Sequence, residues 1–181
     1  GRRRKEPYSY SGLAWRESGE ARFRDGFVEL AGEWLDANPV GRGIHWACQM
    51  EVAIRAVNWI AAYGLFAEAP GIPRGFWSRY VATLRWHARF IRGNLEVGRR
   101  SNNHYLADAC GLFLTGLFFQ GTWEGRRWAA FGQRILEQQA RWQVHPDGVH
   151  FEKSISYHRL VTEMLLVALA CGDQAGRPFS R

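Results

Sequence analysis

The sequence is poor in lysine and cysteine, and it lacks any long apolar stretch that is free of charge. Lysine occurs only at Lys5 and Lys153, so nearly all of the basic residues are arginine. The three cysteines, Cys48, Cys110 and Cys171, have neither disulfide-framework nor zinc-site spacing, and we expect them to be small apolar side chains. No apolar run reaches the roughly 18 residues of a membrane helix, so no membrane span is predicted. No signal peptide is visible, which leaves the compartment unknown from the residues alone.

Positive charge and tryptophan are what the sequence has in excess. The formal net charge is +7, the isoelectric point is about 9.8, and nine residues are tryptophan. Such a charge predicts an anionic partner, which is nucleic acid, acidic lipid or acidic polysaccharide. Arginine favours planar, bidentate contacts with carboxylate, sulfate or phosphate groups, and tryptophan rings stack on sugars. Nucleic acid is the weakest of these partners because no recognised binding motif accompanies the charge.

The length of 181 residues suits one domain, or a large part of one. Residues 1–18 are basic and contain Pro7 and Gly12, so we expect an irregular arm there. Residues 19–181 are expected to form a single helical domain.

Apolar residues recur at helical spacing in six segments, and no segment shows convincing strand-like alternation. Three of the segments are amphipathic and three are apolar around most of their circumference, and the two kinds alternate along the chain. The amphipathic segments are 20–37, 76–95 and 124–142. The apolar segments, which we expect to be buried, are 46–67, 103–119 and 156–171.

This alternation predicts an all-α fold of antiparallel αα-hairpins that forms part of an incomplete (α/α) toroid. Alternate helices of such a stack begin at the same end. The polar loops that precede residues 46, 103 and 156 should therefore meet at one mouth.

The residues expected at this mouth have structural interpretations as well as functional ones. Asn102 fits a helix cap and Asn103 a first-turn residue. His104 fits a buried core histidine, and Tyr157 fits a core aromatic. No HExxH-type spacing is present, and His150 and His158 are too far apart to share a helix face, so no metal site is predicted.

Three segments carry a family resemblance: SNNHYL at 101–106, DGVHFEKSISYH at 147–158, and residues 38–55. Together they resemble the α-helical toroid domain of the heparinase II/III family of polysaccharide lyases, over roughly residues 20–171. The resemblance implies β-elimination on a uronic-acid polysaccharide such as heparan sulfate, heparin or alginate, without metal or cofactor. It also implies a bacterial protein that is periplasmic or secreted.

The resemblance and the chemistry of elimination together suggest roles for individual residues. The uronate carboxylate must be neutralised while the C5 proton is removed, and we expect Asn103 and His104 to do this. In the family pattern the tyrosine of the YH pair is the acid/base, which is Tyr157 here. A phenol is ordinarily protonated at neutral pH, which suits the acid role better. The residues expected to bind substrate are Asn102, Arg100, Glu152, His158, Trp46 and Arg55.

The sequence departs from the family pattern at its end. The family joins the toroid to a C-terminal β-sandwich that supplies a further catalytic residue, whereas nothing after Cys171 resembles a strand. We therefore expect a fragment of a longer chain. Two other functions stay open, namely a non-catalytic module that binds anionic glycans and, less favoured, a glycoside hydrolase. For the hydrolase, Asp108, Glu152 and Glu51 are the only candidate carboxylates, and no spacing places two of them at one bond.

Overall fold

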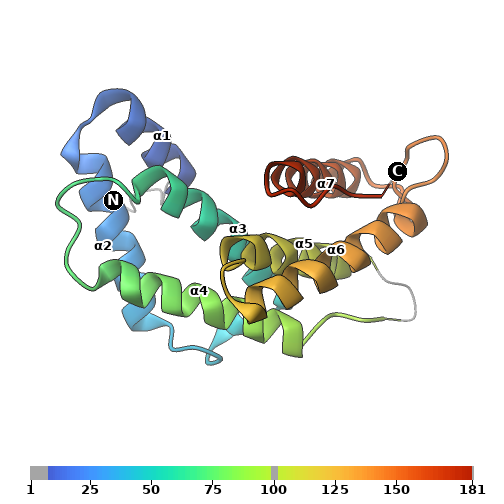
Figure 1. Ribbon diagram of the computed structural model, residues 1–181, viewed down its shortest axis with the longest axis horizontal. Helices are drawn as coiled ribbons and strands as arrows, with labels where there is room; N and C mark the ends of the chain where they lie inside the picture. Colours follow the sequence, from blue (N-terminus) through green and yellow to red (C-terminus); the bar gives the residue numbers. More distant parts are fainter. Residues whose placement is uncertain (1–7, 99–101, 181) are drawn as a thin grey trace.

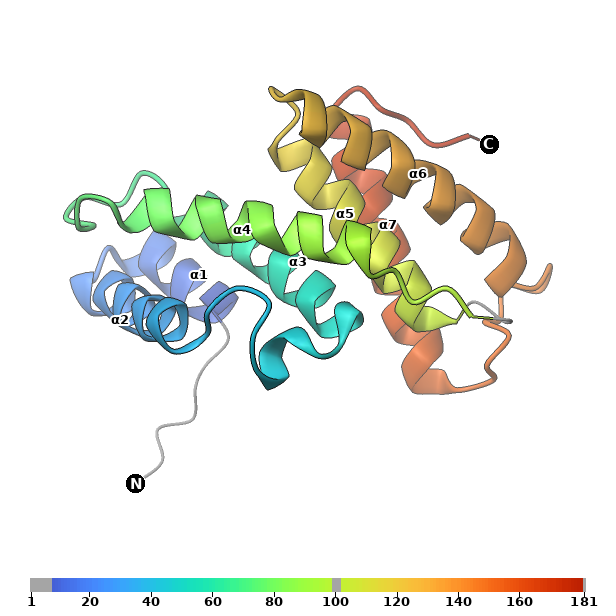
Figure 2. The same cartoon turned by 90° about the horizontal axis from the view of Figure 1, so that it is seen from below.

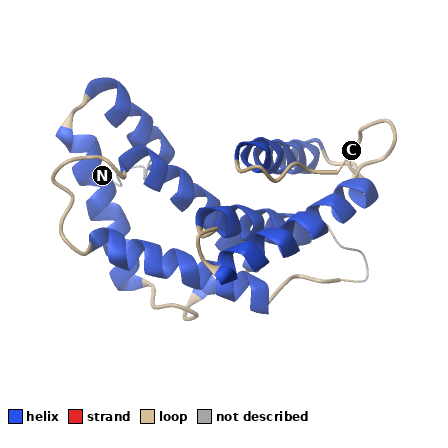
Figure 3. Cartoon of the chain, viewed as in Figure 1, coloured by secondary structure: helices blue, strands red, loops and turns tan. Residues whose placement is uncertain are grey.

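The computed structural model describes residues 8–98 and 102–180, and this part of the chain contains only helices, turns and loops, with no strand (Figure 3). The all-α prediction is confirmed, and each expected helix begins and ends within one turn of its predicted bounds. The helices are α1 (Tyr8–Ser18), α2 (Ala21–Ala37), the short 3-10 helix η1 (Ile44–Trp46), α3 (Gln49–Phe66), α4 (Phe76–Gly93), α5 (Asn103–Phe118), α6 (Trp123–Gln143) and α7 (Ile155–Gln174).

The helices form a curved double row, which is part of an (α/α) toroid. One row consists of α1, α3, α5 and α7, each packed on the next, and the second row consists of α2, α4 and α6. Figure 1 shows the resulting arc, with α1 and α2 near one end and α7 near the other. In the orthogonal view, α5 is seen between α4 and α6 (Figure 2).

The predicted irregular arm is wrong for the described part of residues 1–18, because residues 8–18 form α1. This helix is stabilised by packing on α3. The Arg16 guanidinium donates to the backbone oxygens of Gly64 and Leu65 at 2.8 and 3.0 Å. Gly12 allows the close approach, since a Cβ at this position would lie 2.8 Å from the Cβ of Leu65. Residues 1–7 lie outside the described part.

The core is centred on α5, which is buried around most of its circumference. It packs closely on α6 at Gly132, where a Cβ would lie 2.7 Å from the backbone nitrogen of Phe113 and 2.8 Å from the oxygen of Ala109. Such a distance leaves no room for a side chain on α6 at this position. The contact fixes the position of α5 against α6, and the first turn of α5 carries Asn103 and His104.

Burial of α7 was predicted, but only one of its faces is buried. Val161, Met164 and Ala168 pack against α5, whereas Leu166 and Leu169 are 59% and 40% exposed. The physical reason is position, because α7 is the last helix of the described residues and α5 is its main partner among them. By length and hydropathy α7 could also cross a membrane, which is weak evidence because a core helix satisfies the same criteria.

Candidate active site at the start of α5

Asn102 caps α5. Its Oδ1 accepts a hydrogen bond from the backbone N–H of His104 at 3.1 Å, which satisfies one of the free N–H groups of the first turn. The cap interpretation of this residue is therefore confirmed.

Asn103 binds a carboxylate, that of Glu152. Its backbone nitrogen donates to Oε1 at 3.0 Å, and its Nδ2 lies 2.9 and 3.0 Å from the two oxygens. The positive end of the α5 dipole adds to this attraction. Asn103 is 2% exposed, and its buried Oδ1 has no hydrogen-bond partner among the described residues. Glu152, predicted to bind substrate, thus holds the side chain of Asn103 in place.

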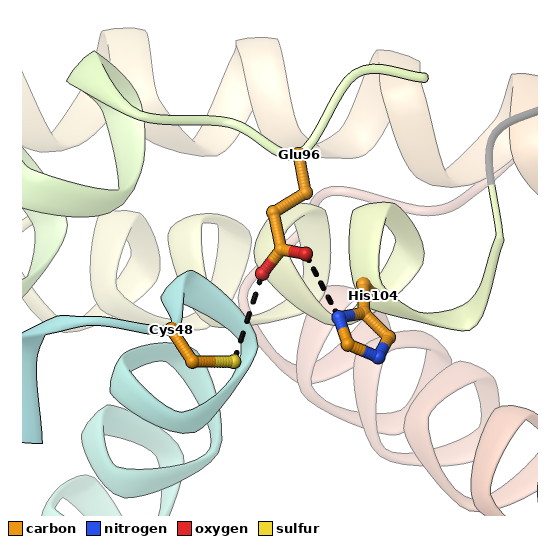
Figure 4. Close-up of side chains that lie close together, drawn as sticks. All are labelled: Cys48, Glu96 and His104. Atoms are coloured by element: carbon orange, nitrogen blue, oxygen red, sulfur yellow. Dashed lines mark hydrogen bonds and ion pairs between the residues drawn. The ribbon is translucent and has the colours of Figure 1, made fainter. Parts of the chain in front are cut away.

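His104 is paired with Glu96, which lies in the loop after α4. The imidazole Nδ1 is 2.8 Å from Oε2 of Glu96, and the two side chains are 38% and 29% exposed. The other oxygen of Glu96 accepts from the backbone N–H of Met50 at 3.2 Å and lies 3.7 Å from Sγ of Cys48. One carboxylate therefore joins the starts of α3 and α5 (Figure 4). Glu96 thus orients the imidazole ring of His104 through Nδ1.

The side chain of Asp108 binds the backbone of Glu96 and so helps to hold this pair in place. Its Oδ2 accepts from the backbone N–H of Glu96 at 2.8 Å. Burial is the largest effect on Asp108 and raises its pKa to about 7. The hydrogen bond from the Glu96 N–H and the nearby His104 lower this pKa, whereas the charge of Glu96 raises it. Asp108 is fully buried, so it does not contact a polysaccharide directly.

A second buried network fixes the neighbouring loop. The Nε2 of Gln143 donates to the backbone oxygen of Asn102 and to Oε1 of Gln139, each at 2.9 Å. The Oε1 of Gln143 lies 2.9 Å from Nε2 of His150, and Nδ1 of His150 accepts from the N–H of Glu152 at 3.4 Å. This arrangement requires a neutral imidazole protonated at Nε2. Burial, the largest effect, lowers the pKa of His150 and favours that form.

The predicted single mouth is confirmed. Hydrogen bonds connect the starts of α3 and α5 through Glu96, and they connect the start of α5 to the loop before α7 through Glu152. We call the set Glu96, Asn102, Asn103, His104 and Glu152 the mouth.

Tyr157 and His158 are exposed residues in the first turn of α7, five and six residues after Glu152 of the mouth. Ser154 caps this helix by accepting from the N–H of Tyr157 at 3.4 Å. Tyr157 is 44% exposed, and its hydroxyl makes no hydrogen bond within the described part of the chain. The phenol is therefore free to meet a ligand, and the core-aromatic interpretation is wrong.

Of two further predicted substrate-binding residues, Trp46 lies in the core and Arg55 is partly buried and engaged in hydrogen bonds. Trp46 is 4% exposed, and its ring packs on those of His87 and Phe90, so it offers no free face to a sugar. The guanidinium of Arg55 donates to Nε2 of His87 and to the oxygen of His45, each at 2.9 Å. A third predicted residue, Arg100, lies outside the described residues.

Three side chains of kinds that commonly bind metal ions also lie close together at the mouth. Cys48, Glu96 and His104 each offer an atom, and these atoms lie within 4.8 Å of one another. They suit a transition metal by type. The same atoms are also engaged in the hydrogen bonds described above, so the absence of a metal stays a prediction.

The sequence did not single out Glu96, Gln143 or His150 as site residues. His150 lies within the DGVHFEKSISYH segment, so the motif contained it without indicating its role. Glu96 and Gln143 carry no local signal, because their partners lie in other helices.

Comparison with known proteins finds similar sequences. Residues 3–179 match the sequence model of the family described as Heparinase II/III N-terminus. The heparin-sulfate lyase of Pedobacter heparinus is 23% identical over 161 residues, which are 86% of this chain and 24% of that protein. The heparin-sulfate lyase of Bacteroides stercoris is 23% identical over 185 residues, 91% of this chain and 27% of that protein. The chain thus spans about a quarter of the length of these relatives.

Solved structures show the same fold. A crystal structure of heparinase III superposes with a TM-score of 0.80 at 18% identity, covering 96% of this chain and 27% of that one. The heparan sulfate lyase HepC from Pedobacter heparinus gives a TM-score of 0.77 at 21% identity, covering 96% and 28%.

Proposed function

Because the chain belongs to the heparinase II/III family and forms its N-terminal helical part, we propose that its mouth is one wall of a polysaccharide lyase active site. The substrate we infer is a uronic-acid polysaccharide of the heparan sulfate type, since similar proteins are heparin-sulfate lyases. The observation that carries the proposal is the Asn103–Glu152 contact. It supports binding of a carboxylate at the N-terminus of α5, the chemical group that a uronate presents.

The reaction is a β-elimination. A base takes the proton from C5 of the uronate, the electron pair forms the C4–C5 double bond, and the C4–O4 bond breaks. Negative charge that develops on the carboxylate during this step is stabilised by fixed donors. We assign this role to the side-chain amide of Asn103 and to the imidazole of His104, whose Nδ1 is bound by Glu96. An amide nitrogen carries two hydrogens, and one of them suffices for Glu152.

Proton transfer to the leaving O4 is assigned to Tyr157, whose hydroxyl is exposed and unengaged among the described residues. Because Asn103 is 2% exposed, contact with the uronate requires a small movement of the mouth. The proposal needs no metal, since amide and imidazole donors take the charge-stabilising role. The base for C5 is expected from a C-terminal β-rich domain of the intact protein.

A glycoside hydrolase is not supported by this geometry. Such an enzyme needs two carboxyl groups that flank one bond. Asp108 is fully buried beneath Glu96, and Glu152 is bound to Asn103.

The test uses the intact protein with heparan sulfate, heparin and alginate, and follows the ultraviolet absorbance of the unsaturated uronate product. We expect product from heparan sulfate. Tyr157→Phe and Asn103→Ala should each lower kcat by about 10²–10⁴-fold without unfolding the chain. No product from any of the three polysaccharides would exclude a lyase and leave the glycan-binding module. Near-normal turnover by either variant would overturn its assigned role.

A further inference from the structure

A hollow between α4 and α6 concentrates arginine and aromatic side chains that the mouth does not use. Its volume is about 540 Å³, and α4 contributes Arg92 to its lining while α6 contributes the rest. We call it the arginine groove and define it by Arg92, Trp123, Arg127, Phe131 and Arg134.

The guanidinium groups of the groove lie over aromatic rings. The Cζ atoms of Arg92 and Arg134 are 4.1 and 5.4 Å from the centroid of the Phe131 ring, and Cζ of Arg127 is 5.3 Å from that of Trp123. Stacking of this kind fixes the guanidinium plane. It leaves the N–H groups at the edge of the plane able to donate to an anion.

The charge of the groove is not neutralised from within. Arg92, Arg127 and Arg134 are exposed, and in residues 8–98 and 102–180 no carboxylate lies within ion-pair distance of them. The carboxylate in the lining, Glu124, is already bound by Arg85 and by Arg89, the latter at 3.1 Å. These contacts lower the pKa of Glu124, with the Arg85 hydrogen bond as the largest cause. A net positive site remains, and it suits sulfate or carboxylate groups.

The groove is linked to the mouth along the chain, because Arg92 lies in the last turn of α4 and Glu96 of the mouth follows four residues later. Burial, then Asp108, raise the pKa of Tyr105, whereas Arg134 and Arg92 lower it. An extended anionic chain that enters the mouth can continue along the end of α4 toward the groove.

We propose that the arginine groove binds the sulfate and carboxylate groups of a polysaccharide chain beyond the sugars that react. The inference rests on the proposed function for the identity of the chain, and it adds a second binding site on α4 and α6. Trp123, which is 61% exposed, offers a face on which a sugar can stack. The site makes long chains better ligands than short ones, because simultaneous contacts raise the effective concentration of the second site.

The test compares two triple variants of the intact protein with equal loss of charge. The groove variant carries Arg92→Gln, Arg127→Gln and Arg134→Gln. The control carries Arg22→Gln, Arg74→Gln and Arg79→Gln, exposed arginines on α2, before α4 and at the start of α4. Binding to heparan sulfate is measured over a range of salt concentrations, without reference to turnover. kcat/KM is measured with long chains and with short oligosaccharides.

We expect the groove variant to lose about tenfold in affinity for long chains, to depend less on salt, and to keep its kcat/KM on short oligosaccharides. The control should lose much less affinity, and Trp123→Ala should weaken long-chain binding. Equal losses in the two triple variants would overturn the proposal, because bulk charge would then explain binding. A groove variant that also loses kcat/KM on short oligosaccharides would overturn the proposal as well. Absence of turnover with the expected binding result would count against the lyase assignment alone.

Discussion

Glu96 and His104 form a carboxylate–imidazole pair, with Oε2 of Glu96 2.8 Å from Nδ1 of His104. The pair lies beside Asn103, and its carboxylate also accepts from the start of α3. Glu96 thus sets both the orientation of the imidazole and the distance between two helix starts.

Replacing Glu96 by Gln should lower kcat with little change in KM. Glutamine presents a neutral amide in place of the carboxylate that binds Nδ1, so the ring of His104 is held less firmly toward the substrate. The loss should be smaller than the about 10²–10⁴-fold expected when a proton-transfer group is removed. The measurement is steady-state kinetics with nitrogen NMR of the His104 tautomer. Glu33→Gln, an exposed change on α2, is the control. An unchanged kcat in the Glu96 variant would show that the pair is only structural.

Replacing Gly132 by Ala should destabilise the chain by about 1–3 kcal/mol, because the added methyl collides with the backbone of α5. Gly26→Ala on α2 is the matched control. No atom lies within 4 Å of its added Cβ, so it should stabilise by up to about 1 kcal/mol through helix propensity. Denaturant unfolding measures both. A neutral Gly132 variant would mean that α5 and α6 can separate without cost.

Replacing Asp108 by Asn should remove a loss of stability that occurs as pH rises. The carboxyl has a pKa of 3.8 when unfolded and about 7 when folded. Between these values the unfolded chain has released a proton that the folded chain retains, so unfolding becomes more favourable. From pH 4 to pH 8 the variant should therefore gain on the order of 4 kcal/mol relative to the parent chain. Urea unfolding at several pH values tests this, and Asp173→Asn, an exposed site, should show no such trend.

His87 should remain neutral well below its ordinary pKa. Burial and then the charge of Arg55 lower the pKa of His87 to about 3, against a raising effect of the Thr83 carbonyl. The Nε of Arg55 donates to Nε2, so the proton resides on Nδ1. The associated stability is present above pH 6.5 and is lost as pH falls toward 3. Nitrogen NMR should show the Nδ1–H tautomer at pH 5, and titration of this ring near 6.5 would contradict the prediction.

Much of the fold follows from the sequence alone. The spacing of apolar residues predicted six helices with nearly correct bounds. The alternation of amphipathic and apolar helices predicted the stack of hairpins. The caps at Asn102 and Ser154 are local interactions, which explains why the helix starts were predictable. Where local signals conflicted with packing, the prediction was wrong. Gly12 indicated a loop, but in contact with Leu65 it permits α1 to pack on α3.

What the sequence determined is the set of groups brought to one end of the stack: the Asn103–His104 pair and Tyr157, each placed by its helix start. What only the tertiary structure decided is which polar groups pair with them. Glu96, Glu152 and Gln143 find their partners in other helices, and Trp46 is buried by neighbours that are distant in the chain. The physical reason is that helix spacing is a property of adjacent residues, whereas burial and pairing of a side chain depend on elements that meet only after folding.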